Sequence, residues 1–197
     1  MFIDDKLSTK PVPGPFVGAG AEALMSRLYD YEDGPIAFQD PSRGLRYQQW
    51  RAYLKDYVVW LEADNMPPME LIKTPDNTIT DISIAFSNNA DLHYVWTDNG
   101  VTKLHWYNTA TSAFETMTMP DGVRTPKLTL DDKRPTQMAR NDIILTYIKS
   151  DHKLYFRKQR DRFGVEYLLD DGPFIGIERF YMNTGWRLQW LLTRGTP

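Results

Sequence analysis

Two histidines in this chain could form a metal site, provided that neighbouring strands bring them together. His93 and His105 stand in two short segments with alternating apolar residues, and the loop 98–100 separates these segments. Neutral imidazoles on facing strands can bind a divalent ion. No third ligand is evident, because His152 falls in another part of the chain. We therefore expect both histidines on an exposed polar face, and we predict neither a metal nor a cofactor.

The pairing of these two segments follows from the face on which their apolar residues lie. A three-residue loop at 98–100 would pair Thr97 with Val101, place His93 opposite His105, and bring the apolar residues of both segments to one buried face. Those residues are Leu92, Tyr94, Trp96, Leu104 and Trp106.

A second hairpin is predicted in the segment 145–156. A two-residue turn at 150–151 would close it, so that Leu145 pairs with Phe156 and Tyr147 pairs with Leu154. Two hairpins with consistent burial predict antiparallel β-structure in this part of the chain.

Two pairs of neighbouring carboxylates, Asp131-Asp132 and Asp170-Asp171, could act as the acid and base of a glycoside hydrolase. Such an enzyme needs two carboxyl groups at a defined separation, one of them with a raised pKa. Adjacent aspartates at strand ends more often form turns, because their side chains bond to nearby backbone N–H groups. The sequence also lacks the Asp-box pattern of sialidase propellers. We therefore assign both pairs to turns.

A basic run with interleaved aromatic residues covers 153–163 and could contact a nucleic-acid strand. On a strand, however, alternate side chains point to opposite faces, and Asp161 and Glu166 interrupt the charges. The formal net charge of -3 also disfavours general nucleic-acid binding. The run is therefore predicted to form a salt-bridged surface or a subunit contact, with three arginines as candidates: Arg157, Arg160 and Arg162.

Motifs for nucleophilic or phosphate chemistry are missing from the sequence. Its cysteine count is 0, which excludes disulfides, thiolate metal sites and a cysteine nucleophile. The glycines at 14, 18 and 20 are no phosphate loop, because no strand precedes them and no Gly-Lys-Ser or Gly-Lys-Thr follows. A Gly-x-Ser-x-Gly elbow does not occur either. We predict that the protein is not an enzyme.

The first 33 residues differ in composition from the rest of the chain. Prolines and glycines alternate through 11–20 and rule out a helix interior or a central strand there, whereas 19–29 contains good helix formers. We predict an extended arm over 1–33, with a short helix as an option, followed by a β-rich domain over 34–197. Such an arm can order on a neighbouring subunit, and its candidate contacts are Pro11, Pro13 and Phe16.

Weak internal similarity predicts repeated units of short strands. Residues 36–38 (Ile-Ala-Phe) recur at 84–86, and 103–106 (Lys-Leu-His-Trp) resemble 153–156 (Lys-Leu-Tyr-Phe), at offsets of 48 and 50 residues. A period near this length with about four strands per unit is typical of propeller blades. Chance similarity between hairpins is the alternative explanation. The predicted units are 34–74, 79–120 and 124–170, with a terminal hairpin at 174–193.

The predicted fold class is therefore mainly β, with antiparallel hairpins in repeated blade-like units and an extended N-terminal arm. The units would belong to a partial β-propeller or to a β-sandwich. Three units are too few to close a propeller, since closure takes about four to eight blades. Open strand edges would then need partners, so we expect a homo-oligomer or an obligate complex.

Three longer stretches carry a resemblance to one protein family: Asp81–Phe86, Arg124–Arg134 and Leu154–Tyr167. They resemble bacteriophage virion proteins, small structural proteins associated with the tail, and the resemblance covers roughly 35–192. It brings no catalytic signature. It implies a structural role in many copies within a particle, with identical copies and other tail proteins as partners.

Three functions are compatible with the sequence. The first is a structural protein of the phage tail that acts in assembly and is located in the virion. The second is a glycan-binding module for a host surface, because the 6 Trp and 11 Tyr residues could stack on sugar rings. The third is a propeller-type glycoside hydrolase. The start 1–5 has no basic or apolar signal region and no run of about 18 apolar residues occurs, so we expect neither a signal peptide nor a membrane span.

Overall fold

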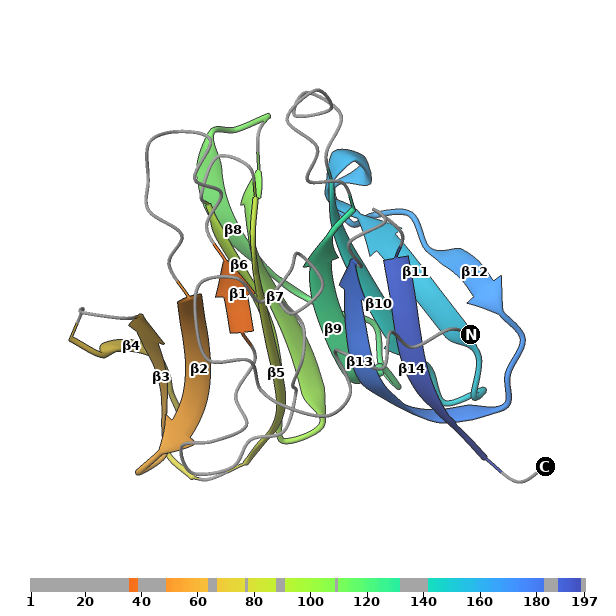
Figure 1. Cartoon of the computed structure of the whole chain (residues 1–197), viewed down its shortest axis with the longest axis horizontal. Helices are drawn as coiled ribbons and strands as arrows, with labels where there is room; N and C mark the ends of the chain where they lie inside the picture. Colours follow the sequence, from red (N-terminus) through yellow and green to blue (C-terminus); the bar gives the residue numbers. More distant parts are fainter. Residues whose placement is uncertain are drawn as a thin grey trace.

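The protein is built from antiparallel β-sheets (Figure 1). The computed structural model describes residues 36–38, 49–63, 67–76, 78–87, 91–108, 110–131, 142–182 and 188–195. Within these ranges the chain forms strands β1 to β14 and one short 3-10 turn, and it contains no α-helix. Every strand pairs with strands that adjoin it in sequence, so each sheet is a simple meander.

Four sheets follow one another along the chain. Sheet I contains β1 (Ile36–Phe38), β2 (Gln49–Lys55), β3 (Val58–Ala63) and β4 (Met69–Lys73). Sheet II contains β5 (Ile79–Phe86), β6 (Leu92–Asp98), β7 (Val101–Asn108) and β8 (Ala113–Thr118). Sheet III contains β9 (Arg124–Leu130), β10 (Ile143–Ile148), β11 (Leu154–Lys158) and β12 (Tyr167–Asp170), with the 3-10 turn Gln159–Asp161 after β11. In the described part of the chain, sheet IV contains β13 (Phe174–Met182) and β14 (Leu188–Arg194).

These sheets coincide with the predicted units, and the prediction of antiparallel, mainly β structure is confirmed. The sequence similarities fall on equivalent strands. Residues 36–38 form the first strand of sheet I, and 84–86 end the first strand of sheet II. Residues 103–106 lie on the third strand of sheet II, and 154–156 lie on the third strand of sheet III. The period near 50 residues is therefore the length of one four-stranded meander.

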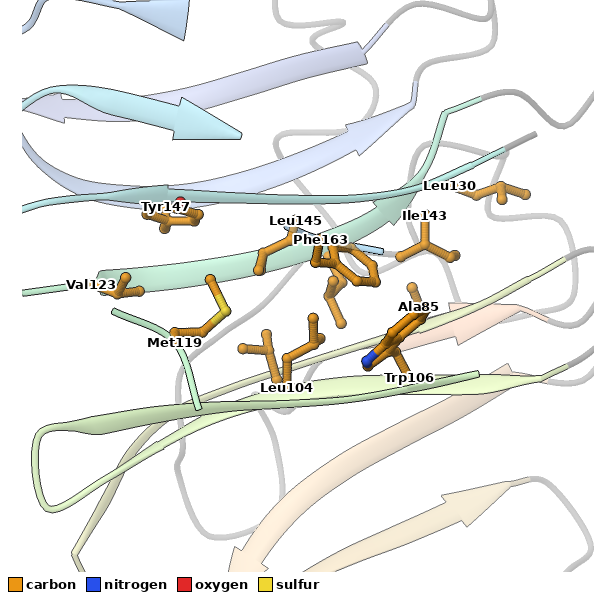
Figure 2. Packing of buried hydrophobic residues seen from close by; sticks show 12 residues of the cluster. Ala85, Leu104, Trp106, Met119, Val123, Leu130, Ile143, Leu145, Tyr147 and Phe163 are labelled. Carbon is orange, nitrogen blue, oxygen red and sulfur yellow. The ribbon is translucent and has the colours of Figure 1, made fainter. Parts of the chain in front are cut away.

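The sheets pack face to face as successive layers, and each interface buries an apolar cluster. Between sheets I and II, the rings of Trp50 and Phe86 lie 5.6 Å apart, and Leu61 and Ile84 are buried beside them. Between sheets II and III, the rings of Trp106 and Phe163 meet edge to face at 5.3 Å (Figure 2). Between sheets III and IV the cluster consists of Ile144, Ile148, Leu154, Phe174, Ile177 and Phe180.

Inner strands of sheets II and III, such as β6 and β10, are consequently buried on both faces. All six residues of β10 are buried, whichever way they point. In β6, Val95 belongs to the cluster shared with sheet III, whereas Trp96 belongs to the cluster shared with sheet I. Full burial of both faces is a property expected for parallel sheets or inner layers, and it removes the apolar-polar alternation on which strand register is usually inferred.

The first strands of successive sheets meet at their edges. The backbone N–H of Leu128 on β9 donates to Ser83 Oγ on β5 over 2.9 Å. On the opposite side, the backbone N–H of Ile177 on β13 donates to Thr125 Oγ1 on β9 over 3.2 Å. The inner edges of β5, β9 and β13 are thus joined by side chains rather than by a continuous β-ladder.

Candidate functional site

The predicted pairing of the two histidines is wrong by one residue. Asp98 pairs with Val101, and Tyr94 rather than His93 pairs with His105. The hairpin closes with a two-residue turn, in which Asn99 and Gly100 have φ values of 49° and 76°. Adjacent residues on a strand point to opposite faces, so the two imidazoles lie on opposite faces of sheet II. A metal site shared by them is therefore excluded by geometry.

His93 is an internal residue, not part of an exposed face. Its side chain is buried, and Nδ1 donates to the carbonyl oxygen of Asp91 over 2.9 Å. Nε2 is then the acceptor, and it receives the backbone N–H of Tyr107 at 3.3 Å and Gln159 Nε2 at 3.1 Å. Burial lowers the pKa of His93 to about 4. The neutral ring joins β6 and β7 to the 3-10 turn of sheet III.

His105 forms part of an aromatic row across sheet II. Its ring stacks on Tyr94 at 4.6 Å and on Phe114 at 5.2 Å, while Nδ1 contacts Thr116 Oγ1 at 2.9 Å. Burial lowers the pKa of His105, so the ring is neutral at pH 7. The row ends at Phe114, whose side chain is 48% exposed at the outer strand β8.

The second predicted hairpin is also out of register by one residue. Tyr147 pairs with Tyr155, and Ile148 pairs with Leu154. The loop is longer than the predicted two residues, because the backbone N–H of Lys149 bonds to the carbonyl oxygen of Lys153. Both register predictions are wrong for the same physical reason. Where both faces of a strand are buried, the alternation of apolar residues does not determine which residues pair.

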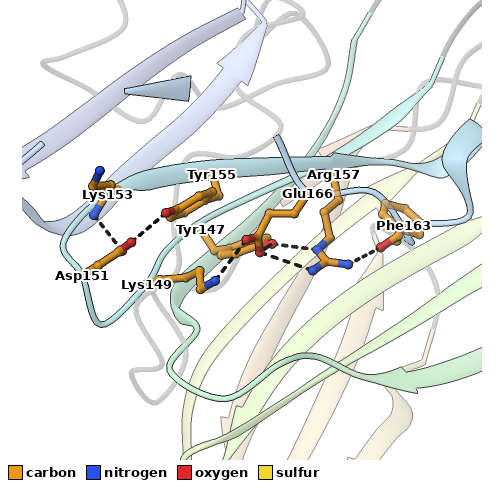
Figure 3. A network of polar contacts seen from close by, with 8 residues as sticks. All are labelled: Tyr147, Lys149, Asp151, Lys153, Tyr155, Arg157, Phe163 and Glu166. Atoms are coloured by element: carbon orange, nitrogen blue, oxygen red, sulfur yellow. Dashed lines mark hydrogen bonds and ion pairs between the residues drawn. The ribbon is translucent and has the colours of Figure 1, made fainter. Parts of the chain in front are cut away.

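Arg157 is the centre of a polar network inside sheet III (Figure 3). Nε donates to the Tyr147 hydroxyl at 2.7 Å, and Nη1 donates to the carbonyl oxygen of Phe163 at 2.6 Å. Nη2 forms an ion pair with Glu166 at 3.3 Å, and Lys149 reaches the other oxygen of Glu166 at 3.0 Å. Arg157 is 8% exposed, which places it in the interior rather than on the predicted contact surface.

The network keeps the Tyr147 hydroxyl protonated and does not activate it as a nucleophile. The hydroxyl donates to Glu166 Oε2 over 2.5 Å, and burial together with this bond raises the pKa of Tyr147. Burial alone would raise the pKa of Glu166, but hydrogen bonds from Tyr147, Lys149 and Arg157 lower it below its ordinary value. A buried phenol with a raised pKa is a poor nucleophile. The arrangement therefore supports structure, not catalysis.

The other two predicted arginines differ in their surroundings. Arg160 pairs with the buried carboxylate of Asp142, which receives both its Nε at 2.5 Å and its backbone N–H at 2.8 Å. Arg162 is exposed and follows the 3-10 turn with φ 52°. Arg160 and Arg162 are both exposed, so each has the accessibility that a subunit contact needs, and Arg157 does not. The remaining interface candidates, Pro11, Pro13 and Phe16, and the whole predicted arm lie outside the described residues.

The paired carboxylates form local structure wherever they are described. Asp170 Oδ1 receives the backbone N–H of Gly172 over 3.0 Å, as predicted for a turn. Asp171 forms an exposed ion pair with Lys153 at 3.0 Å. Asp131 Oδ1 receives the backbone N–H of Asp142 at 2.7 Å, and its neighbour 132 lies outside the described residues.

Exposed apolar side chains mark the last strand of every four-stranded sheet. Strand order places β4, β8 and β12 at the edge opposite to the first strands. Met69 on β4 is 43% exposed, Phe114 on β8 is 48% exposed, and Leu168 and Leu169 on β12 are 51% and 40% exposed. We call these four residues the outer rim. Large apolar side chains on unpaired strand edges favour contacts with other chains.

Among the residues described, no three His, Asp or Glu side chains gather in a way that could hold a metal ion. No helix in the same part of the chain is long and apolar enough to cross a membrane. No protein-family model, curated protein or solved structure matches the chain significantly.

Proposed function

We propose that this chain is a structural component of a bacteriophage virion, in the tail, and that it acts in assembly through protein–protein contacts. The family resemblance of the sequence supports this role. The structure adds support through the outer rim, where three strand edges each carry at least one exposed large apolar side chain. The partners would be identical copies and other tail proteins, and the chain would be located in the virion.

The four sheets are, in this proposal, consecutive blades of an open, propeller-like fan. Three features support it: successive four-stranded meanders, face-to-face packing, and first strands that meet at their edges. The fourth sheet has only two strands in the described part of the chain. A fan of this kind leaves strand edges available for assembly, as a closed ring of blades does not.

A paired substitution on β12 tests the assembly role. Replacing Leu168 and Leu169 by Lys should leave the melting temperature nearly unchanged, because both side chains are exposed, but it should reduce oligomer size and incorporation into particles. Thr118→Lys is the matched control, since it adds a charge to the outer strand β8 without removing an apolar side chain.

Size measurement of the purified chain and mass spectrometry of purified particles would provide the readouts. Wild-type protein is expected in particles at many copies, and the paired variant is expected in few. Particles that contain no copy of the chain would refute the virion role. Normal incorporation of the paired variant would instead remove the outer rim from the assembly contacts.

The aromatic row favours a second function, a glycan-binding module of the tail. Tyr94, His105 and Phe114 form a neutral stacked row whose end is exposed, and aromatic surfaces of this kind stack on sugar rings. A glycan array probed with wild-type protein and with Phe114→Ala would test it. Binding that disappears in the variant would support this second function, and an array without signal would refute it.

A further inference from the structure

Three buried hydrogen-bond donors lie without an acceptor between sheets III and IV. They are Lys127 Nζ, Thr129 Oγ1 and Trp190 Nε1. Lys127 and Thr129 are each only 1% exposed. Leaving one buried donor unpaired costs about 1–3 kcal/mol, and more when the group is charged. Three such donors in one interface therefore require an explanation beyond packing.

The register of β9 places these donors on facing surfaces. Lys127 lies opposite Thr146, and Thr129 lies opposite Ile144, so their side chains share a face of sheet III with Ile144. Ile144 belongs to the cluster buried against sheet IV, and Trp190 packs on that same cluster from β14. The side chains that carry the ammonium, the hydroxyl and the indole N–H therefore all leave their strands toward the interface between the two sheets.

Neighbouring polar groups are already engaged elsewhere. Thr146 Oγ1 donates to the carbonyl oxygen of Tyr155 at 2.9 Å, and Thr125 Oγ1 receives the backbone N–H of Ile177. Asp81 attracts the charge of Lys127, yet no ion pair forms between them. Burial raises the pKa of Asp81, so this carboxylate is itself disfavoured as a buried anion.

We propose that the interface between sheets III and IV binds a carboxylate group, which accepts hydrogen bonds from Lys127, Thr129 and Trp190. A carboxylate has two oxygens with about four acceptor sites, which suffices for three donors. Its single negative charge balances the single ammonium, whereas a phosphate dianion would leave one buried negative charge without a partner. A neutral amide would leave the ammonium uncompensated.

The carboxylate can come from a free small acid or from an acidic residue of another protein chain. Two probes separate these sources. Acetate represents the free acid, and N-acetyl-aspartyl amide represents an aspartate within a peptide. Acetamide and N-acetyl-asparaginyl amide are the neutral controls of the same shape, and sodium chloride at equal ionic strength controls for general salt effects.

Melting temperatures of the full chain in these solutions test the proposal. Acetate should raise the melting temperature of wild-type protein by at least about 2 °C over chloride, because a ligand that binds only the folded state stabilises it. Lys127→Met and the nearly isosteric Thr129→Val should lose this shift. Lys73→Met, which removes an exposed lysine on β4, should keep it.

Each result of the melting-temperature test supports or overturns the proposed carboxylate site. A shift with acetate alone identifies a free small acid, and a shift with both acids shows that the site also admits a peptide-borne carboxylate. An equal shift with acetamide, an unchanged shift in Lys127→Met, or no difference between both acids and chloride would overturn the proposal. The outcome is independent of whether particles contain the chain.

Discussion

Gln159 on the 3-10 turn of sheet III donates a hydrogen bond from Nε2 to Nε2 of His93 on sheet II, over 3.1 Å. The same amide nitrogen also donates to the carbonyl oxygen of Tyr107 at 2.8 Å. One glutamine thus joins two strands of the preceding sheet to its own sheet. This bond requires an unprotonated Nε2, so its strength depends on pH.

Acid should destabilise the protein through His93. Burial holds its pKa at about 4 in the folded state, against 6.5 ordinarily, so the unfolded chain takes up a proton first as the pH falls. Stability is therefore lost between about pH 6.5 and pH 4, by about 3 kcal/mol in total. Urea unfolding at several pH values should show this loss in wild-type protein and not in His93→Gln. His105→Ala is the control: it retains His93 and should show most of the same loss of stability in acid. Equal pH profiles for wild type and His93→Gln would contradict the assignment of this loss to His93.

Lys127 should make the stability of the protein depend on pH in the alkaline range. In chloride solution, burial lowers its pKa to about 8 from 10.5, so the folded chain loses this proton before the unfolded chain does. Stability should therefore rise between about pH 8 and pH 10, by about 3 kcal/mol. Lys127→Met should be more stable than wild type at pH 7 and should lack the rise. A variant less stable than wild type at pH 7 would show that the ammonium is better satisfied than its surroundings indicate.

Substitution of the buried Arg157 should destabilise the protein far more than substitution of the exposed Arg162. Arg157→Ala removes three contacts of a buried side chain, to Tyr147, Phe163 and Glu166, and leaves Lys149 as the cation beside Glu166; it should cost about 3 kcal/mol of unfolding free energy. Tyr147→Phe removes one acceptor of Arg157 and should cost about 1–3 kcal/mol. Arg162→Ala should change stability by less than about 0.5 kcal/mol. Similar costs for Arg157→Ala and Arg162→Ala in urea unfolding would show that the network contributes little.

Two glycines with similar backbone angles should respond differently to alanine. Gly100 and Gly172 have φ values of 76° and 78°, so a side chain is strained at both. A Cβ at Gly100 meets no atom within 4 Å, whereas one at Gly172 would lie 2.2 Å from the carbonyl oxygen of His152. Thermal unfolding should show that Gly172→Ala costs about 1–3 kcal/mol more than Gly100→Ala. Equal costs would mean that the backbone around His152 moves freely.

The division of the chain into four sheets could be predicted because it depends on sequence periodicity. The recurrence of Ile-Ala-Phe at 36–38 and 84–86 falls on two strands that occupy the same position in the strand order of their sheets. The turn residues between the strands also predicted the bounds of the four units to within a few residues. A repeated meander leaves weak similarity in the sequence at a fixed period, even when the individual contacts of the repeats differ.

Strand register and the places of the histidines could not be predicted in the same way. Alternation predicts register only where one face of a sheet is buried, but Val95 and Trp96 are adjacent and both buried, against different sheets. Asn99-Gly100, a strong two-residue turn signal, would have given the right register for this hairpin. The burial of Lys127 and Thr129 carried no local signal, because the strands that pack on β9 from other sheets, β5 and β13, are distant in sequence.

Sequential pairing has a consequence for how the chain acquires its structure. Each strand pairs with a strand next to it in sequence, and each layer packs on the layer that precedes it. Contacts of this kind close short loops, which keeps the entropic barrier to folding low for a β-protein. During synthesis, sheet I can emerge and pair before the residues of sheet III have left the ribosome. Each new layer then meets an apolar face that is already formed, so the chain can fold in the direction of translation.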